Sequence, residues 1–340
     1  MEHWSLTILA VLGAGLAFDF VNGFHDASNS IATIIATRVL KPKQAVLWAA
    51  FFNIVAVFFF GTGVAKTVGV GLVSLSEITP LVVLSGLIGA TLWGIATWRF
   101  GLPTSSSHAL LGGYAGSAMA HSALQSGWSA IGSPIIAAGW VKVILFIVIA
   151  PVMGSLMAIL LMRALLYLQS HGKFKPSKAT YKNIQLCSSA FLSLMHGSND
   201  AQKTAGILTS ALVAGGALSS FEIPHWVLGL SYTMMGLGTL FGGWRIVLTM
   251  GKRLTQLDPR GGVCAESAAA LSIMTATMLD LPVSTTHVTT GAILGVGVAT
   301  DPRLVRWKIG RRIAWAWILT VPASALTGAC VMALVGLLGR

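Results

Sequence analysis

The sequence predicts an all-α integral membrane protein, and composition and segment length are the reasons. The chain has 340 residues, of which 55% are hydrophobic and only 9% are charged, and its mean hydropathy is +0.79. Such a composition lies well outside that of soluble globular domains. Apolar runs of about 17 to 25 residues can cross a bilayer as helices, and the chain contains roughly ten of them. A transmembrane β-barrel is a poor alternative, since no alternating pattern of about ten residues recurs.

The first half of the chain divides into five apolar segments. The first begins at Leu6, is predicted to break at Asn22-Gly23, and resumes as helix from Ala27 to Thr37, because glycine and polar residues interrupt apolar helices. The next four segments are Ala45–Ala65, Leu81–Phe100, Thr104–Ala120 and Pro134–Leu168. A polar, basic linker over residues 169–182 follows, and we expect it to be cytoplasmic.

The second half again contains five apolar segments, which are Ile184–Val213, Trp226–Met250, Val263–Leu279, Val283–Ala299 and Ile313–Leu338. Equal numbers before and after the linker predict an internal repeat. Because five is odd, the two halves must have opposite orientations in the membrane. We therefore predict a first inverted repeat over residues 1–168 and a second over residues 183–340, as in many secondary transporters.

The positions of lysine and arginine predict the topology. If the N-terminus is outside, 18 of the 22 Lys and Arg residues fall on the cytoplasmic side, as the positive-inside rule requires. We therefore predict a multi-pass protein of the inner (plasma) membrane with both termini outside. The net charge of +12 does not indicate nucleic-acid binding, because the basic residues cluster in short loops between apolar runs.

One polar motif occurs twice inside apolar segments. The first copy is NGFHDASNSIATIIAT, from Asn22, and the second is HGSNDAQKTAGILTSA, from His196. Each places an aspartate, Asp26 or Asp200, three residues after a glycine. A carboxylate at that depth is costly because hydrocarbon cannot solvate it, so intramembrane acids usually have a function. Two such sites suggest a substrate path, and the alternative is a structural ion pair.

A second motif is also repeated. LPTSSSH at Leu102–His108 matches LPVSTTH at Leu281–His287, an offset of 179 residues, close to the 174 that separate the two aspartates. Each proline ends one apolar arm and the hydroxyl cluster begins the next. The arms are either full spans or re-entrant helical hairpins with their tips near mid-membrane. We favour hairpins, because broken helices with polar tips are how inverted-repeat transporters build a site.

These motifs carry groups that suit a protonated anion. Helix N-termini offer unpaired N–H groups, and first-turn serine and threonine add hydroxyl donors, although such clusters also serve as N-caps or packing contacts. Hydrogen phosphate can donate its P–OH to an aspartate, whereas fully ionised sulfate would be repelled. The same aspartate can hold a coupling cation or titrate. The acceptors are Asp26, Asn29, Asn199 and Asp200.

Histidines and one glutamate complete the candidate set. His25, His108, His196 and His287 lie beside the motifs, and we favour a role as hydrogen-bond anchors over proton relay. Without ligand-spaced cysteines or a metalloprotease pattern, we predict no metal centre and no cofactor. Glu266 is a further acid with no acidic counterpart in the first half, and it is either functional or structural. We find no sequence evidence for a catalytic site, so the protein is not expected to be an enzyme.

Together, GFHDASNS, HGSNDAQKTAG and the paired PTSSSH and PVSTTH segments resemble the inorganic phosphate transporter (PiT) family, from about residue 22 to 299. The resemblance implies phosphate uptake driven by a cation gradient, in a fold of two inverted repeats that often forms a homodimer. Carried over by position, it implies that phosphate is held by Ser105, Ser106, Ser107, Ser284, Thr285 and Thr286, with Asp26, Asn29, Asn199 and Asp200 at adjoining phosphate or cation positions.

Two departures from the sodium-coupled members affect the coupling ion. His25 precedes Asp26 where an asparagine is expected, and Lys203 stands where the first repeat has Asn29. An ammonium cannot ligate sodium and competes for its site as a fixed charge. The pattern is similar to the bacterial low-affinity branch regarded as proton-coupled, which carries phosphate partly as neutral metal-phosphate. The predicted coupling residues are Asp26, Asp200, Lys203, His25 and Glu266.

Four alternatives stay open at this point. A sodium-coupled phosphate symporter and a sulfate permease would share the same fold. An anion channel or a phosphate sensor would belong to a different class. A channel needs no coupled ion, and a sensor needs a cytoplasmic output module, for which the linker of about a dozen residues is small.

Overall fold

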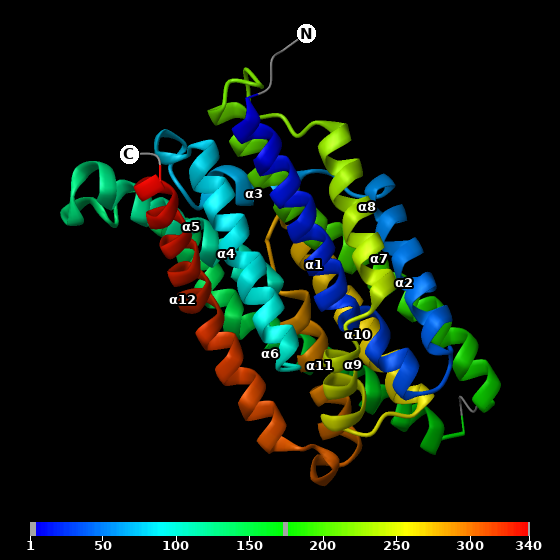
Figure 1. Cartoon of the computed structure of the whole chain (residues 1–340). Coiled ribbons are helices and arrows are strands. Elements are labelled where there is room, and N and C mark those ends of the chain that lie inside the picture. The colour runs from blue at the N-terminus through cyan, green and yellow to red at the C-terminus, as the bar shows by residue number, and fades with distance from the viewer. Residues whose placement is uncertain (1–4, 173–175, 339–340) are drawn as a thin grey trace.

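The computed structural model describes residues 5–172 and 176–338, which form an all-helical protein (Figure 1). The described part of the chain pairs as β-structure only at an isolated bridge between Val73 and Ile135. The helices are α1 (Leu6–Ala36), α2 (Pro42–Val55), α3 (Gly63–Gly71), α4 (Pro80–Arg99), α5 (Ser106–Ser126), α6 (Ala137–Ser170), α7 (Lys178–Ala214), α8 (His225–Phe241), α9 (Trp244–Leu248), α10 (Pro259–Met278), α11 (Thr285–Thr300) and α12 (Trp307–Leu338). Short helical turns lie at Ala56–Phe58, Leu75–Glu77, Trp128–Ala130, Thr249–Arg253 and Pro302–Leu304.

The long apolar helices identify a multi-pass membrane protein. By length and composition, four helices can each cross a membrane, namely α1, α4, α6 and α12. Residues 42–58 with α3 would add a fifth span, bent by 83°. Large apolar side chains such as Leu156 and Leu160 of α6 and Leu319 and Leu326 of α12 are exposed on the outside of the protein, where lipid rather than water is their natural solvent. The other helices are shorter or carry buried polar residues.

The order of elements is the same before and after the connection between α6 and α7. Each half contains a long helix with the aspartate motif (α1, α7), a bent pair (α2–α3, α8–α9), two helices joined by a Pro-Ser/Thr segment (α4–α5, α10–α11) and a long helix with an internal proline (α6, α12). This correspondence agrees with the predicted internal repeat. Its inverted orientation, and the boundaries at 1–168 and 183–340, remain predictions.

The two halves interleave. α12 packs on α4 and α5 of the first half, while α6 packs on α10 and α11 of the second. Glycines make both contacts close, since a Cβ on Gly116 would lie 2.0 Å from the carbonyl oxygen of Ala325, and one on Gly295 would lie 2.4 Å from that of Ser155. Small residues let helix backbones approach in this way within membranes. Each hairpin is therefore covered by the other half's last helix.

The predicted break at Asn22-Gly23 is wrong, because α1 continues through it and α7 likewise runs through the second motif. The glycines serve contact between helices instead. A Cβ on Gly23 would lie 1.9 Å from the carbonyl oxygen of Met235 in α8, and one on Gly197 would lie 2.5 Å from that of Asn53 in α2. The breaks fall in the bent pairs, between α2 and α3 and at Gly242-Gly243 between α8 and α9.

The connection over residues 169–182 is shorter than predicted. α6 extends to Ser170, and α7 begins at Lys178, where the Ser177 hydroxyl caps the helix by accepting from the Thr180 N–H at 3.1 Å. Lys173 and Lys175 of the predicted basic linker lie outside the described residues.

The first turn of α1 and the last turns of α12 lie at the same end of the protein, opposite the α1–α2 and α11–α12 connections (Figure 1). This agrees with termini on one side of the membrane, while the side itself remains a prediction.

Candidate functional site

The two Pro-Ser/Thr segments form the tips of helical hairpins. Ser105 caps α5 by accepting the His108 N–H at 3.1 Å, and Ser284 caps α11 by accepting the His287 N–H at 3.2 Å. These two hydroxyls are therefore used as N-caps, the alternative that the sequence left open. The rings of His108 and His287 lie 4.8 Å apart, so the tips meet inside the protein, as predicted for hairpins.

The hydroxyls of the first helical turns are the groups that line the meeting point. All four are buried, and three of them are bonded to the aspartates or to Asn29. They are Ser106 and Ser107 of α5 and Thr285 and Thr286 of α11. Their position at two opposed helix N-termini brings N–H groups, hydroxyl donors and positive dipole potential to one place.

α1 supplies Asp26 and Asn29 to this place. The Thr286 hydroxyl donates to Asp26 Oδ1 at 3.3 Å, and His25 Nδ1 lies 2.8 Å from the same oxygen. The Asn29 amide donates to the hydroxyls of Thr285 and Thr286 at 3.2 and 3.0 Å. A helix of the first half is thereby joined to the hairpin of the second.

α7 supplies Asp200 and Lys203. The Lys203 ammonium donates to Asp200 Oδ1, to the Ser107 hydroxyl and to the Val283 carbonyl oxygen, each at 2.6 Å. Asp200 Oδ2 accepts from the Thr285 hydroxyl at 2.9 Å. Asp200 and Lys203 are both 1% exposed, so this ion pair lies in the buried interior, where its charge-assisted hydrogen bonds are strong. The ammonium links both hairpin tips to α7.

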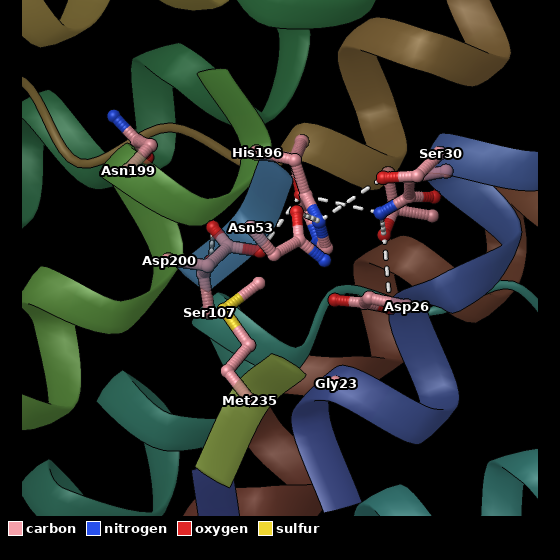
Figure 2. A network of polar contacts seen from close by, with 12 residues as sticks. Gly23, Asp26, Ser30, Asn53, Ser107, His196, Asn199, Asp200 and Met235 are labelled. Carbon is pink, nitrogen blue, oxygen red and sulfur yellow. Dashed lines mark hydrogen bonds and ion pairs between the residues drawn. The ribbon is translucent and has the colours of Figure 1, made fainter. Parts of the chain in front are cut away.

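His196 connects the two aspartate motifs (Figure 2). Its Nε2 lies 3.2 Å from Asp200 Oδ2, and its Nδ1 lies 3.3 Å from both the Ser30 hydroxyl and the Asn53 amide oxygen. Single ligand atoms of Asp26, His196 and Asp200 all lie within 4.8 Å of one another. This cluster can therefore hold a cation, although one oxygen of Asp200 is already paired with Lys203.

Ser30 and Asn53 of this network were not predicted to belong to the site, whereas His196 was predicted as a hydrogen-bond anchor. Sequence reasoning treated His196 as an anchor near the motif and did not consider Asn53. The signal for Asn53 was present, since it is a single amide inside the apolar segment Ala45–Ala65. Only the packing of α2 against α7 brings it to His196.

Other predicted residues lie nearby but contact different groups. Asn199 points toward the second hairpin (Figure 2), where its amide donates to Thr277 at 2.9 Å and its oxygen accepts from the Val283 N–H at 3.3 Å. It holds the backbone of the tip rather than facing Asp26. Its predicted contact with substrate remains a prediction.

Glu266 of α10 belongs to a separate buried network. Its carboxylate accepts from Thr33 at 2.6 Å, from Gln185 at 2.9 Å and from Ser188 at 2.5 Å. Its link to the central site is through Thr33, which lies two turns beyond Asp26 on α1. His25, by contrast, contacts Asp26 directly and also bonds Thr97 at 3.2 Å.

The site can bind a small oxyanion together with a cation. It contains two carboxylates and one ammonium, all buried, at the point where two helix N-termini supply hydroxyl and N–H donors. Buried charges of both signs within a membrane protein mark a path for ions or substrate. An all-helical, multi-pass membrane protein that encloses such groups between hairpin tips has the features of a membrane transporter.

Within this class, the chain belongs to the phosphate transporter family, whose model matches residues 22–179 and 167–328. It is 45% identical, over 95% of its length and 94% of the relative's, to a probable low-affinity inorganic phosphate transporter of Rhizobium meliloti. A protein of Bacillus subtilis with the same description is 39% identical over 95% of both chains. These relatives are transporters and not enzymes.

A solved structure confirms the fold. The structure entitled "The sodium-dependent phosphate transporter" matches with a TM-score of 0.84 over 98% of this chain and 100% of the other, at 23% sequence identity. The likeness shows that the helices of both proteins have the same arrangement. At this identity it carries no argument about the coupling ion.

Proposed function

We propose that the protein imports inorganic phosphate across the inner membrane by alternating access, in symport with protons. Relatives described as probable low-affinity inorganic phosphate transporters support the substrate. Phosphate would be bound by hydroxyls of both hairpin tips, namely Ser106, Ser107, Thr285 and Thr286, beside Asp26 and Asn29. Because these groups come from both halves, rocking of one half against the other would open the site to each side in turn.

The observation that carries the choice of proton is the position of Lys203. Its ammonium binds Asp200 and two oxygens of the hairpin tips at 2.6 Å, so it occupies a position where a metal cation would find a carboxylate, a hydroxyl and a carbonyl oxygen. A fixed ammonium supplies the positive charge there without any bound ion. Sodium is therefore not needed to neutralise Asp200.

The preference for phosphate over sulfate is based on Asp26. A carboxylate repels a fully ionised anion but accepts a hydrogen bond from the P–OH of hydrogen phosphate. Beside His25, Asp26 is bonded by the Thr286 hydroxyl at 3.3 Å, a donor that the P–OH would replace. The uptake experiment described next, carried out with and without a divalent metal, decides whether the metal accompanies phosphate. A homodimer is also proposed, on the family resemblance.

The experiment is uptake of labelled phosphate into proteoliposomes under separately imposed proton and sodium gradients, with sulfate as competitor. We expect accumulation with protons alone, no competition by sulfate, and loss of uptake in Asp26→Asn while the protein still folds and inserts. Dependence on sodium would leave phosphate transport in place and replace the coupling ion. Sulfate uptake without phosphate uptake would refute the substrate, and equilibration without accumulation would indicate a channel.

A further inference from the structure

A third buried aspartate lies on α1, outside the site described above. Asp19 is 0% exposed, and neither of its carboxylate oxygens has a hydrogen-bond partner. It precedes Asp26 by seven residues, which at 3.6 residues per turn places both on the same face of α1, about 10 Å apart. Asn22, between them on that face, also has an unpartnered buried oxygen. An isolated ionised carboxylate is very costly in such a place.

The surroundings of Asp19 contain hydroxyls and no compensating charge. Among the described residues, the groups that act on its carboxylate are the hydroxyls of Thr204 in α7 and Ser231 in α8 and the negative charge of Asp200. Both hydroxyl oxygens are buried and have no hydrogen-bond partner of ordinary length and angle. Several other helices also pack on α1. Of these, α4 and α2 have their charged residues near their ends, at Arg99 and Lys43, and no charged group of α5, α9, α10 or α11 among the described residues acts on the Asp19 carboxylate. The repulsion from Asp200 adds to the cost of a charge on Asp19.

The central aspartates differ from Asp19 in this respect. Asp200 is bound by the Lys203 ammonium at 2.6 Å, and Asp26 lies 2.8 Å from His25. The Lys203 ammonium is a positive partner that favours the ionised carboxylate of Asp200 and opposes proton binding there, while the carboxylate of Asp26 has the His25 ring as a hydrogen-bond partner. Asp19 has no such partner, and protonation is the simplest way to neutralise it. Thr204 faces Asp19 and directly follows Lys203 in α7. A change in the protonation of Asp19 therefore alters the surroundings of the Asp200–Lys203 ion pair.

We propose that Asp19 is the carboxylate that carries the coupling proton, with Thr204 and Ser231 lining the site. The proton binds a carboxylate oxygen from one side of the membrane and leaves to the other side together with phosphate, so only an O–H bond forms and breaks. This inference rests on the proposed proton symport. Under this proposal Asp19 carries the proton, while the groups at the hairpin tips bind the anion.

Two transport modes of the purified full-length protein in proteoliposomes test the inference. Exchange of internal for external phosphate needs only the loaded carrier, whereas net accumulation needs the carrier to release its proton. Asparagine resembles the protonated acid, so Asp19→Asn should keep exchange and lose accumulation. A gradient of one pH unit supports about tenfold accumulation per coupled proton, and the variant should show a ratio of about one. Asp301→Asn is the matched control, because Asp301 lies in an exposed turn, and it should accumulate as the parent does.

The outcomes distinguish this inference from the proposed function. Accumulation by Asp19→Asn equal to that of the parent protein would overturn the role of Asp19 and leave proton symport intact. Failure of the parent to accumulate phosphate with protons would refute the symport itself. Ser231→Ala gives a second test, since removing a hydroxyl that faces the carboxylate should shift the pH of half-maximal uptake. An unchanged pH profile in Ser231→Ala, with exchange lost in Asp19→Asn, would assign Asp19 a structural role and overturn the inference.

Discussion

The ion pair between Asp200 and Lys203 gives a prediction of definite size. Lys203→Met removes the ammonium but keeps a side chain of similar length, and it leaves Asp200 buried at 1% exposure without its cation. Removing one partner of a buried pair typically costs about 3 to 5 kcal/mol of folding stability. The His196 ring lies beside the same carboxylate, with Nε2 3.2 Å from Asp200 Oδ2, and remains there as a polar neighbour, so we expect the lower end of this range.

A double-mutant cycle separates the pair from its individual members. The double variant Lys203→Met with Asp200→Asn contains neither charge and should be more stable than Lys203→Met alone. Thermal unfolding of the purified variants in detergent, followed by intrinsic fluorescence, measures the order of stability. Equal stability of parent and Lys203→Met, or a double variant less stable than the single one, would refute the view that Lys203 neutralises Asp200.

The same site predicts a change in ion dependence. In Lys203→Asn an amide oxygen replaces the ammonium, and Asp200, the Ser107 hydroxyl and the Val283 carbonyl oxygen are released to other cations. Sodium should then stabilise the variant against heat, by an amount that grows with its concentration, and should stimulate phosphate uptake. Potassium at the same ionic strength serves as control. An unchanged response to protons, with no effect of sodium, would count against the role given to Lys203.

Three further predictions concern packing and local structure. Gly23→Ala should prevent folding or strongly destabilise the protein, since its Cβ would meet the Met235 carbonyl oxygen at 1.9 Å. Gly13→Ala is the control and should be tolerated, because the space around Gly13 is open. Membrane yield and thermal unfolding of the two variants test this difference. Ser105→Ala should cost about 1 kcal/mol through loss of the α5 cap and slow phosphate uptake, measured in the same vesicles. Glu266→Ala should destabilise by roughly 1 to 3 kcal/mol, because three donors lose their acceptor, and a stable, fully active variant would contradict this.

The residues of the site could be found from the sequence because their chemistry is incompatible with lipid. Asp26, Asp200 and the two hydroxyl clusters stand out within apolar segments, and a common offset near 175 residues links them in pairs. The pairing also favoured two hairpins with their tips near mid-membrane over full spans. Composition and spacing alone are enough to predict these residues, and folding then brings them together in one site.

The roles that the sequence could not predict depend on contacts with residues from distant segments of the chain. Gly23 suggests a helix break locally, but the approach of α8 determines its role. Asn29 and Asn199 are equivalent in the motifs, yet one bonds the opposite hairpin's hydroxyls and the other holds a tip backbone. Asp19 is a single acid near the end of an apolar run, and its lack of partners is visible only once α7 and α8 are in place.

The covering of each hairpin by the other half's last helix has a consequence for biosynthesis. The α4–α5 hairpin enters the membrane early, but α12, which packs on it, is made after all the other described helices. The glycine-lined surface of the α4–α5 hairpin therefore stays uncovered until the chain has been synthesised through α12. Chains cut short before α12 should be recognised by membrane quality control, so that only molecules containing α12 persist in the bilayer.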